Sequence, residues 1–331
     1  MTVEEFIAQW HDDDTTVEVR TSGSTGDPKV LHVEKRRMLA SARATCDFLG
    51  LKPGDVALLC MSVDYIAGKM MVVRSMERQL HLVTVPPSSH PLASPELKDE
   101  TPSRIDFAAM VPLQVHESLQ VPREREFLGK IKHIIIGGGP LDPAMEQELR
   151  SFDNAVWHSY GMTETLSHIA LRRVSGSDAT PWFTPLPGIS LTTNDENCLV
   201  IHAPHLCSQV LTTHDVVKLE QGTQRFKVLG RIDNVINSGG VKIQMEQVEQ
   251  SLSPYIHHPF IITKCPDAKF GEIVVMLLQG TPADIAEVEA VCSRHLPRYA
   301  CPKRILTVDT LPLTSTGKPA RQQAAHLAQQ D

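Results

Sequence analysis

Nine residues near the start of the chain, "TSGSTGDPK" from Thr21 to Lys29, combine glycines, hydroxyl side chains and a lysine. Glycines let the backbone approach an anion closely, and hydroxyl groups add hydrogen-bond donors. The stretch therefore suits a polyphosphate ligand, although it does not match the phosphate loop G-x-x-x-x-G-K-[ST]. Short glycine- and serine-rich stretches also occur in ordinary surface loops, so this stretch alone leaves both interpretations open.

Four later stretches favour the phosphate interpretation. They are "YGMTET" (160–165), "THDVVKL" (213–219), "GRIDNVINSGGVKIQMEQVE" (230–249) and "PLTSTGKPAR" (312–321). Together with the first stretch, and in this order, they resemble the adenylate-forming superfamily of acyl-CoA synthetases, peptide-synthetase adenylation domains and luciferases. Within it, "NSGGVKI" followed by "EQVE", "AMVPLQV" and the short carboxyl-terminal part are most similar to the branch that joins 2-succinylbenzoate to CoA in menaquinone biosynthesis.

The resemblance implies an ATP site. The β- and γ-phosphates would be held by the first stretch, through Thr21, Ser22, Gly23, Ser24, Thr25, Gly26 and Lys29. In the second motif, Thr163 would contact the α-phosphate and Glu164 would help to hold Mg²⁺; a solvated glutamate in a turn is the ordinary alternative. One carboxylate plus phosphate oxygens is a usual magnesium arrangement. The residues implied around the adenine and the rest of the nucleotide are Gly137, Gly138, Gly139, Pro140, Tyr160, Gly161 and Met162.

The remaining motifs imply the ribose site and the moving parts. Asp215 would accept hydrogen bonds from both ribose hydroxyls, and Arg231 would reach the same sugar. The family usually has Thr-Gly-Asp there, whereas this chain has His214 in place of the glycine. Asp233 falls on the hinge position, about which the small domain would rotate.

Two further segments would complete the chemistry. The resemblance places Ser238, Gly239 and Gly240 along the path of CoA, where an ordinary hairpin turn is the alternative. It also places Lys318 beside the reacting carboxylate and α-phosphate, where it would stabilise developing charge.

The acyl pocket is predicted from charge. 2-Succinylbenzoate keeps one carboxylate that is not activated, and that group needs a cation or donors. Lys69 and Arg74 in the apolar run "MSVDYIAGKMMVVRSM" (61–76) are candidates, although such residues also extend simply to solvent. His158 and His168 lie near the same motif, with a structural role as the alternative for each.

These residues need a scaffold, and the sequence predicts an α/β fold. Buried strands are expected at 55–61, 80–85, 105–111, 132–138 and 154–160, with helices between several of them. The helix "LDPAMEQELRSF" should start at Asp142, with Pro143 in its first turn. We therefore expect a large α/β domain with layered sheets over 1–230, shortened at its front, and a small mobile α+β domain over 231–331.

Composition limits the class of protein. The net charge is −7, which disfavours a nucleic-acid partner, and no apolar run approaches membrane-spanning length. Seven scattered cysteines without a Cys-x-x-Cys pair argue against a disulfide framework and favour a reduced, cytoplasmic protein.

The activity implied is an AMP-forming acid–thiol ligase that uses Mg²⁺, ATP, CoA and an aromatic carboxylic acid. A carboxylate would attack the α-phosphate, and the CoA thiol would then attack the acyl-adenylate. The alternatives are a ligase for another aromatic acid, an enzyme that loads a carrier protein, and a non-catalytic nucleotide-binding protein. A non-catalytic nucleotide-binding protein is disfavoured because the chain retains all of the motif residues together: Lys29, Thr163, Glu164, Asp215, Arg231 and Lys318.

Overall fold

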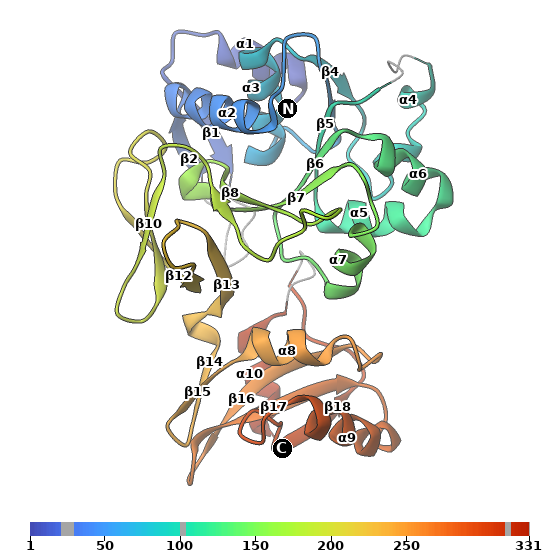
Figure 1. Ribbon diagram of the computed structural model, residues 1–331, viewed down its shortest axis with the longest axis vertical. Coiled ribbons are helices and arrows are strands. Elements are labelled where there is room, and N and C mark those ends of the chain that lie inside the picture. The colour runs from blue at the N-terminus through green and yellow to red at the C-terminus, as the bar shows by residue number, and fades with distance from the viewer. Residues whose placement is uncertain (21–29, 100–103, 315–318, 331) are drawn as a thin grey trace. The chain divides into compact units, whose positions relative to one another are not determined.

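The computed structural model describes residues 1–20, 30–99, 104–314 and 319–330. The chain forms two compact units (Figure 1). Unit 1 comprises Met1–Leu191, Ile201–Leu211 and Leu219–Lys227; unit 2 comprises Thr192–Val200, Thr212–Lys218 and Val228–Asp331. The boundary that the sequence predicts at residue 231 remains a prediction.

Unit 1 is built on a seven-stranded sheet with the order β4-β3-β5-β6-β7-β8-β9. The strands from β4 to β7 are parallel to their neighbours, and β8 and β9 continue the sheet in antiparallel pairing. Strands form at all five predicted positions, and four of them are largely buried; β4, at the edge of the sheet, has no buried residue, so its predicted burial is wrong. The strands are β3 (Val56–Leu59), β4 (His81–Thr84), β5 (Phe107–Met110), β6 (His133–Ile136), β7 (Ala155–Gly161), β8 (His168–Arg173) and β9 (Thr184–Pro185).

Helices cover both faces of this sheet. Leu58, Met110 and Ile136 face one side and form a core with α5, α6 and α7. On the other side, Phe48 of α2 meets Trp157 of β7 edge-on, with ring centroids 5.0 Å apart. The helices of unit 1 are α1 (Val3–Trp10), α2 (Lys35–Leu49), α3 (Ile66–Arg78), α4 (Glu96–Asp99), α5 (Pro112–Gln120), α6 (Pro122–Lys130) and α7 (Pro143–Leu149), with a 3₁₀ turn η1 (Pro91–Ala93).

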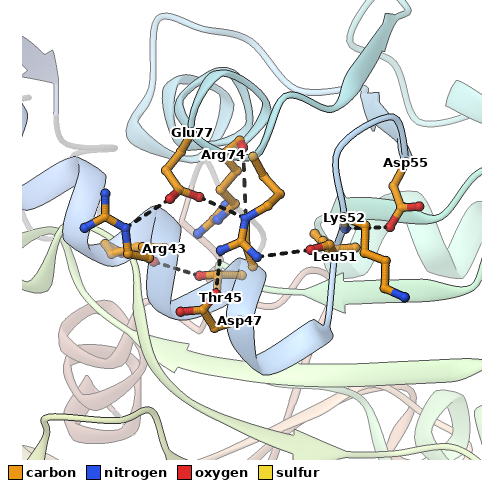
Figure 2. A network of polar contacts seen from close by, with 11 residues as sticks. Arg43, Thr45, Asp47, Leu51, Lys52, Asp55, Arg74 and Glu77 are labelled. Atoms are coloured by element: carbon orange, nitrogen blue, oxygen red, sulfur yellow. Dashed lines mark hydrogen bonds and ion pairs between the residues drawn. The ribbon is translucent and has the colours of Figure 1, made fainter.

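Two local features explain how helices of unit 1 start and pair. The predicted cap of α7 is confirmed, because the Asp142 carboxylate accepts hydrogen bonds from the N–H groups of Ala144 and Met145. Helices α2 and α3 are joined by a polar network, in which Glu77 bridges Arg43 and Arg78 (Figure 2). This network fixes α3 against α2, and each of these helices carries a residue of the site described below.

The first predicted motif connects two strands of a small sheet. β1 (Thr16–Arg20) pairs in antiparallel fashion with β2 (Val30–Glu34), with Arg20 opposite Val30. Residues 21–29, the predicted phosphate-binding stretch, join these strands and lie outside the described residues.

A four-stranded sheet follows along the chain, and unit 2 then has a sheet of its own. The first has the order β10-β11-β12-β13, with strands β10 (Ser190–Thr193), β11 (Cys198–His202), β12 (Leu211–Leu219) and β13 (Phe226–Arg231). The second has the order β15-β14-β17-β16, and β18 pairs with β17. Its strands are β14 (Val235–Ser238), β15 (Val241–Gln244), β16 (Phe260–Asp267), β17 (Gly271–Gln279) and β18 (Arg304–Val308).

Unit 2 has its own apolar core. Met276 and Leu278 of β17 and Leu252 of α8 are fully buried in it. The elements around the sheet are α8 (Met245–Leu252), α9 (Ile285–His295) and α10 (Arg321–Gln330), with 3₁₀ turns η3 (Ile232–Asn234) and η4 (Pro282–Asp284). The predicted class, a large α/β part with layered sheets and a smaller α+β part, is confirmed. Among the described residues, no helix is both long and apolar enough to span a membrane.

Candidate adenylate-forming site

The site of unit 1 lies where two parallel strands end. The glycine stretch Gly137–Pro140 follows β6, and Tyr160 and Gly161 close β7, its neighbour in the sheet. Because carboxyl ends of parallel strands meet at one edge, the structure brings these two predicted segments together. This edge is the usual location of ligand sites in open α/β sheets.

The predicted Thr163–Glu164 motif forms a tight turn between β7 and β8. A Cβ on Gly161 would lie 2.3 Å from the Ser167 carbonyl oxygen, so only glycine fits there. Residues Thr163–Thr165 form a 3₁₀ turn, and Leu166 follows with a positive φ of 65°. Strained backbone of this kind is common at functional sites. The turn leaves Glu164 exposed and Thr163 half-buried.

Tyr160 stands in an aromatic cluster. Its ring meets Phe226 edge-on at 5.1 Å and Phe183 at 5.9 Å, and those two phenyl rings stack on each other. The cluster fixes the tyrosine beside the glycine stretch, where the sequence predicts adenine.

His158 supports the glycine stretch through a hydrogen bond. Arg172 Nε–H points to His158 Nδ1 at 3.2 Å, so the neutral ring carries its proton on Nε2 and donates to the Gly139 carbonyl oxygen at 3.0 Å. Burial, and then the charge of Arg172, lower the pKa of His158 to about 4. The ring is therefore neutral at physiological pH and acts as a fixed donor.

Arg172, the cation beside His158, is paired with a carboxylate. Arg172 binds both carboxylate oxygens of Glu146, at 2.8 and 2.6 Å. Burial raises the pKa of Glu146, but the hydrogen bonds and charge of Arg172 outweigh that effect and lower it overall. The pair is a bidentate one, the strong geometry for arginine and carboxylate.

Arg74 has no such partner. Its side chain is 3% exposed, and Nη2 donates to Ser167 Oγ at 2.7 Å. Within the described parts of the chain it forms no ion pair, and its Nε–H has no hydrogen-bond partner. Burial lowers the pKa of Arg74 to about 10, so the guanidinium remains a cation at neutral pH. A buried cation with free donors is suited to an anionic ligand.

His168 lies directly beside Ser167 and Arg74. Its Nε2 is 3.0 Å from Thr45 Oγ1 and its Nδ1 is 3.3 Å from Ser167 Oγ. Burial, and then the charge of Arg74, lower the pKa of His168 well below its usual value. Both histidines have hydrogen-bond partners within the protein, and their predicted place near the acyl pocket remains a prediction.

Lys69 occupies different surroundings from Arg74. Its side chain is 1% exposed, its Nζ lies over the Phe6 ring at 4.7 Å and 3.2 Å from Met1 Sδ. Five positions along a helix correspond to about 140° of rotation, so the two cations leave α3 in different directions. Neither extends to solvent, and Arg74 contacts Ser167 next to the turn of the second motif.

The predicted ribose and hinge residues gather in unit 2. Arg231 lies 3.5 Å from an Asp215 carboxylate oxygen and 3.0 Å from one of Asp233. His214, which replaces the usual glycine, places its Nδ1 3.0 Å from Asp233. The His214 hydrogen bond is the main cause of a lowered pKa at Asp233, and Arg231 adds to it against the effect of burial. The departure from the usual motif thus adds a contact to the predicted hinge.

The predicted CoA segment is a two-residue hairpin. Gly239 and Gly240, between β14 and β15, have φ values of 57° and 84°. Positive φ at both central positions is what a type I′ turn requires. Ser238 is buried at the end of β14, and the Gly239 N–H donates to the Phe270 carbonyl oxygen at 2.8 Å.

Lys318 lies outside the described residues, but the chain around its segment is fixed. Leu313 pairs with Pro319 as an isolated bridge. Arg321, at the start of α10, binds both carboxylate oxygens of Glu249, at 2.6 and 2.7 Å. Arg321 belongs to the quoted motif, yet the sequence assigned it no role; the structure makes it the anchor of that segment.

Glu164 fits the predicted magnesium chemistry. Its carboxylate is exposed at the turn, and the described residues contain no group of three or more metal-ligating side chains. Mg²⁺ commonly binds through one or two carboxylates, with waters and substrate phosphates as the other ligands. A single exposed carboxylate beside the predicted nucleotide site is compatible with that requirement.

Sequence reasoning missed the groups that hold the predicted residues. Thr45 on α2, Ser167 and the Arg172–Glu146 pair are all partners of predicted side chains. Ser167 directly precedes the predicted His168 in the sequence, which is its only signal. Thr45 carries none, since it meets His168 only through packing of α2 on the sheet.

Comparisons with known proteins identify the family. The AMP-binding enzyme family matches residues 4–199, and the AMP-binding enzyme C-terminal domain matches residues 265–318. A 2-succinylbenzoate–CoA ligase of Enterococcus faecalis is 26% identical over 330 residues, covering 91% of this chain and 67% of that protein.

Two solved structures share the fold. An acyl-CoA synthetase (AMP-forming)/AMP-acid ligase II-like protein of Dyadobacter fermentans is 32% identical, covers 98% of this chain and 93% of its own, and gives a TM-score of 0.66. The o-succinylbenzoate CoA synthetase of Bacillus subtilis, in complex with its acyl-adenylate intermediate, is 23% identical, covers 94% of this chain and 69% of its own, and gives a TM-score of 0.76. The chain belongs to the AMP-binding enzyme family, which confirms the resemblance to the adenylate-forming superfamily.

Proposed function

We propose that this protein is an ATP-dependent acid–CoA ligase that works through an acyl-adenylate, with 2-succinylbenzoate as its acid. The relative from Enterococcus faecalis bears that activity in its name, and it matches 91% of this chain. The product would be 2-succinylbenzoyl-CoA, with AMP and diphosphate, and we propose that it is made in the cytoplasm for menaquinone biosynthesis.

One observation carries the choice of acid. Arg74 is a buried cation that touches the turn of the nucleotide motif through Ser167 and has donors to spare. 2-Succinylbenzoate brings one carboxylate to be activated and a second that is not. The guanidinium can receive the second carboxylate with two parallel hydrogen bonds. A monocarboxylic acid would leave the cation uncompensated.

The other residues would orient the reaction. Thr163 and Lys318 would donate to the α-phosphate and the reacting carboxylate, and Asp215 and Arg231 would hold the ribose. When bound, Mg²⁺ would offset phosphate charge near Glu164. No protein nucleophile is required, since the carboxylate and then the CoA thiol attack in turn; the task of the chain is positioning and charge stabilisation.

The test is product formation. The purified protein, with ATP and Mg²⁺, should release pyrophosphate when 2-succinylbenzoate is added, and should form its CoA thioester only when CoA is also present. Pyrophosphate release without any thioester would favour the loading of a carrier protein. Release with benzoate but not with 2-succinylbenzoate would favour another aromatic acid, and no release with any acid would leave a nucleotide-binding protein.

A variant checks the metal role independently. Glu164→Gln keeps the shape of the side chain and removes its charge, so half-maximal activity should need several times more Mg²⁺. An unchanged magnesium titration would assign Glu164 a structural role.

A further inference from the structure

Arg74 is held by a chain of hydrogen bonds whose direction is fixed at one end. The Ser41 carbonyl oxygen can only accept, and Thr45 Oγ1 lies 3.0 Å from it. The single Thr45 hydroxyl proton is therefore used there. Consequently the Thr45 oxygen must accept from His168 Nε2–H, at 3.0 Å.

The protonation of His168 at Nε2 fixes the direction of the remaining hydrogen bonds, as far as Arg74. A neutral imidazole that is protonated at Nε2 has only an acceptor at Nδ1. Ser167 Oγ lies 3.3 Å from that nitrogen and donates its proton to it. The Ser167 oxygen is then free to accept from Arg74 Nη2–H at 2.7 Å. Each group in the chain of hydrogen bonds from α2 to α3 therefore has one possible assignment as donor and acceptor.

The chain is largely buried, with Ser167 half-buried. Ser41 and Thr45 on α2 are 1% and 0% exposed, and His168 is 6% exposed. The Ser167 carbonyl is also fixed, since Thr165 Oγ1 lies 2.8 Å from it. Hydrogen bonds linked in this way strengthen one another in a low-dielectric interior.

We propose that Ser167 and His168, supported by Thr45, are positioning residues that orient the Arg74 guanidinium toward the second carboxylate of the acid substrate. The inference rests on the proposed function, because it takes Arg74 as the group that recognises that carboxylate. One N–H of Arg74, on Nη2, donates to Ser167, which follows the second motif in the sequence. The Nε–H, which has no partner among the described residues, stays available for the substrate. The nucleotide motif and the acid-recognition group are thereby joined in one rigid unit.

The experiment compares two acids in the full-length enzyme. 2-Succinylbenzoate carries both carboxylates, and 3-benzoylpropionate lacks the one on the ring. Ser167→Ala and His168→Gln should each raise the KM for 2-succinylbenzoate about tenfold. The KM values for 3-benzoylpropionate and for ATP should change less than twofold. His133→Gln, which replaces a half-buried histidine at the start of β6, is the matched control and should leave all three KM values unchanged.

A double variant separates positioning from general damage. With Arg74→Leu already present, Ser167→Ala should add less than twofold to the KM for 2-succinylbenzoate, since nothing remains to be oriented. Nitrogen NMR of the folded wild-type protein should show His168 protonated at Nε2 and unprotonated at Nδ1. Thr45→Val should weaken that preference.

Each result has a definite meaning. If Arg74→Leu impairs both acids alike, the proposed acid recognition fails, and the inference fails with it. If Arg74→Leu is selective but Ser167→Ala and His168→Gln impair both acids alike, or add fully to Arg74→Leu, the proposed function stands and the inference is overturned. The opposite tautomer of His168 also overturns it.

Discussion

His158 on β7 and His168 on β8 are both buried and neutral, but the charges around them differ. Arg172, beside His158, is bound by both oxygens of Glu146. Arg74, next to His168 through Ser167, has no carboxylate partner in the described parts of the chain. A buried unpaired charge costs several kcal/mol. The balanced network is therefore a support, whereas the unbalanced one is suited to an anion that the protein itself does not supply.

The strongest test of this difference is stability. Arg172→Leu leaves the Glu146 carboxylate largely buried without its cation, so the free energy of unfolding should fall by about 2 kcal/mol, the pair being partly exposed. Arg74→Leu removes an uncompensated cation and should leave stability unchanged or raise it. Urea denaturation of the two variants measures both effects. An equal loss in both would remove the distinction between the networks.

Lower pH should reduce the stability of the protein through His158. Folding lowers the pKa of His158 from 6.5 to about 4 through burial and then the charge of Arg172. Below pH 6.5 the unfolded chain takes up a proton that the folded chain refuses until about pH 4, so stability falls as the pH falls through this window. His158→Gln should reduce that slope by about 1.4 kcal/mol per pH unit.

The control for the acid experiment is an exposed histidine. His81→Gln, on β4, should leave the slope as it is in the unchanged protein. Unfolding midpoints in urea from pH 7 to pH 4.5 provide the comparison. Equal slopes for His158→Gln and the wild type would mean that the buried ring does not stay neutral.

The two histidines should also affect different substrates. His158 holds the carbonyl of Gly139 in the predicted adenine site, so His158→Gln should raise the KM for ATP about fivefold, equivalent to about one hydrogen bond. It should leave the KM for the acid nearly unchanged, the reverse of His168→Gln. A rise in the acid KM alone would place His158 in the acyl pocket, as the sequence had suggested.

The smallest effect belongs to a third histidine, which is exposed. The side chain of His214 is 60% exposed and that of its partner Asp233 is 52% exposed. Exposed pairs are worth less than about 1 kcal/mol, so His214→Ala should change the free energy of unfolding by no more than about 0.5 kcal/mol. Urea denaturation of this variant checks it, and a loss several times larger would show that the contact at the predicted hinge holds unit 2 together.

The sequence predicted the parts of this molecule that depend on local pattern. Continuous apolar runs located the strands of the sheet, and Asp142 with Pro143 located the start of α7. The order of the motifs indicated the family. It could not predict that Arg172 pairs with Glu146 or that Thr45 meets His168, because those contacts arise from packing between distant segments. The sequence offered both Lys69 and Arg74 as candidates, with Arg74 preferred for its guanidinium, but it could not predict that Lys69 lies over Phe6 and that Arg74 contacts Ser167.

The most direct test of the central claim is acid selectivity. The measurement is kcat/KM for CoA-thioester formation from 2-succinylbenzoate and from 3-benzoylpropionate, in the wild type and in Arg74→Leu. A charge-assisted contact to the second carboxylate should make the wild type prefer 2-succinylbenzoate by about 100-fold. Arg74→Leu should abolish that preference by impairing only the dicarboxylic acid. The same preference in both proteins would contradict the account.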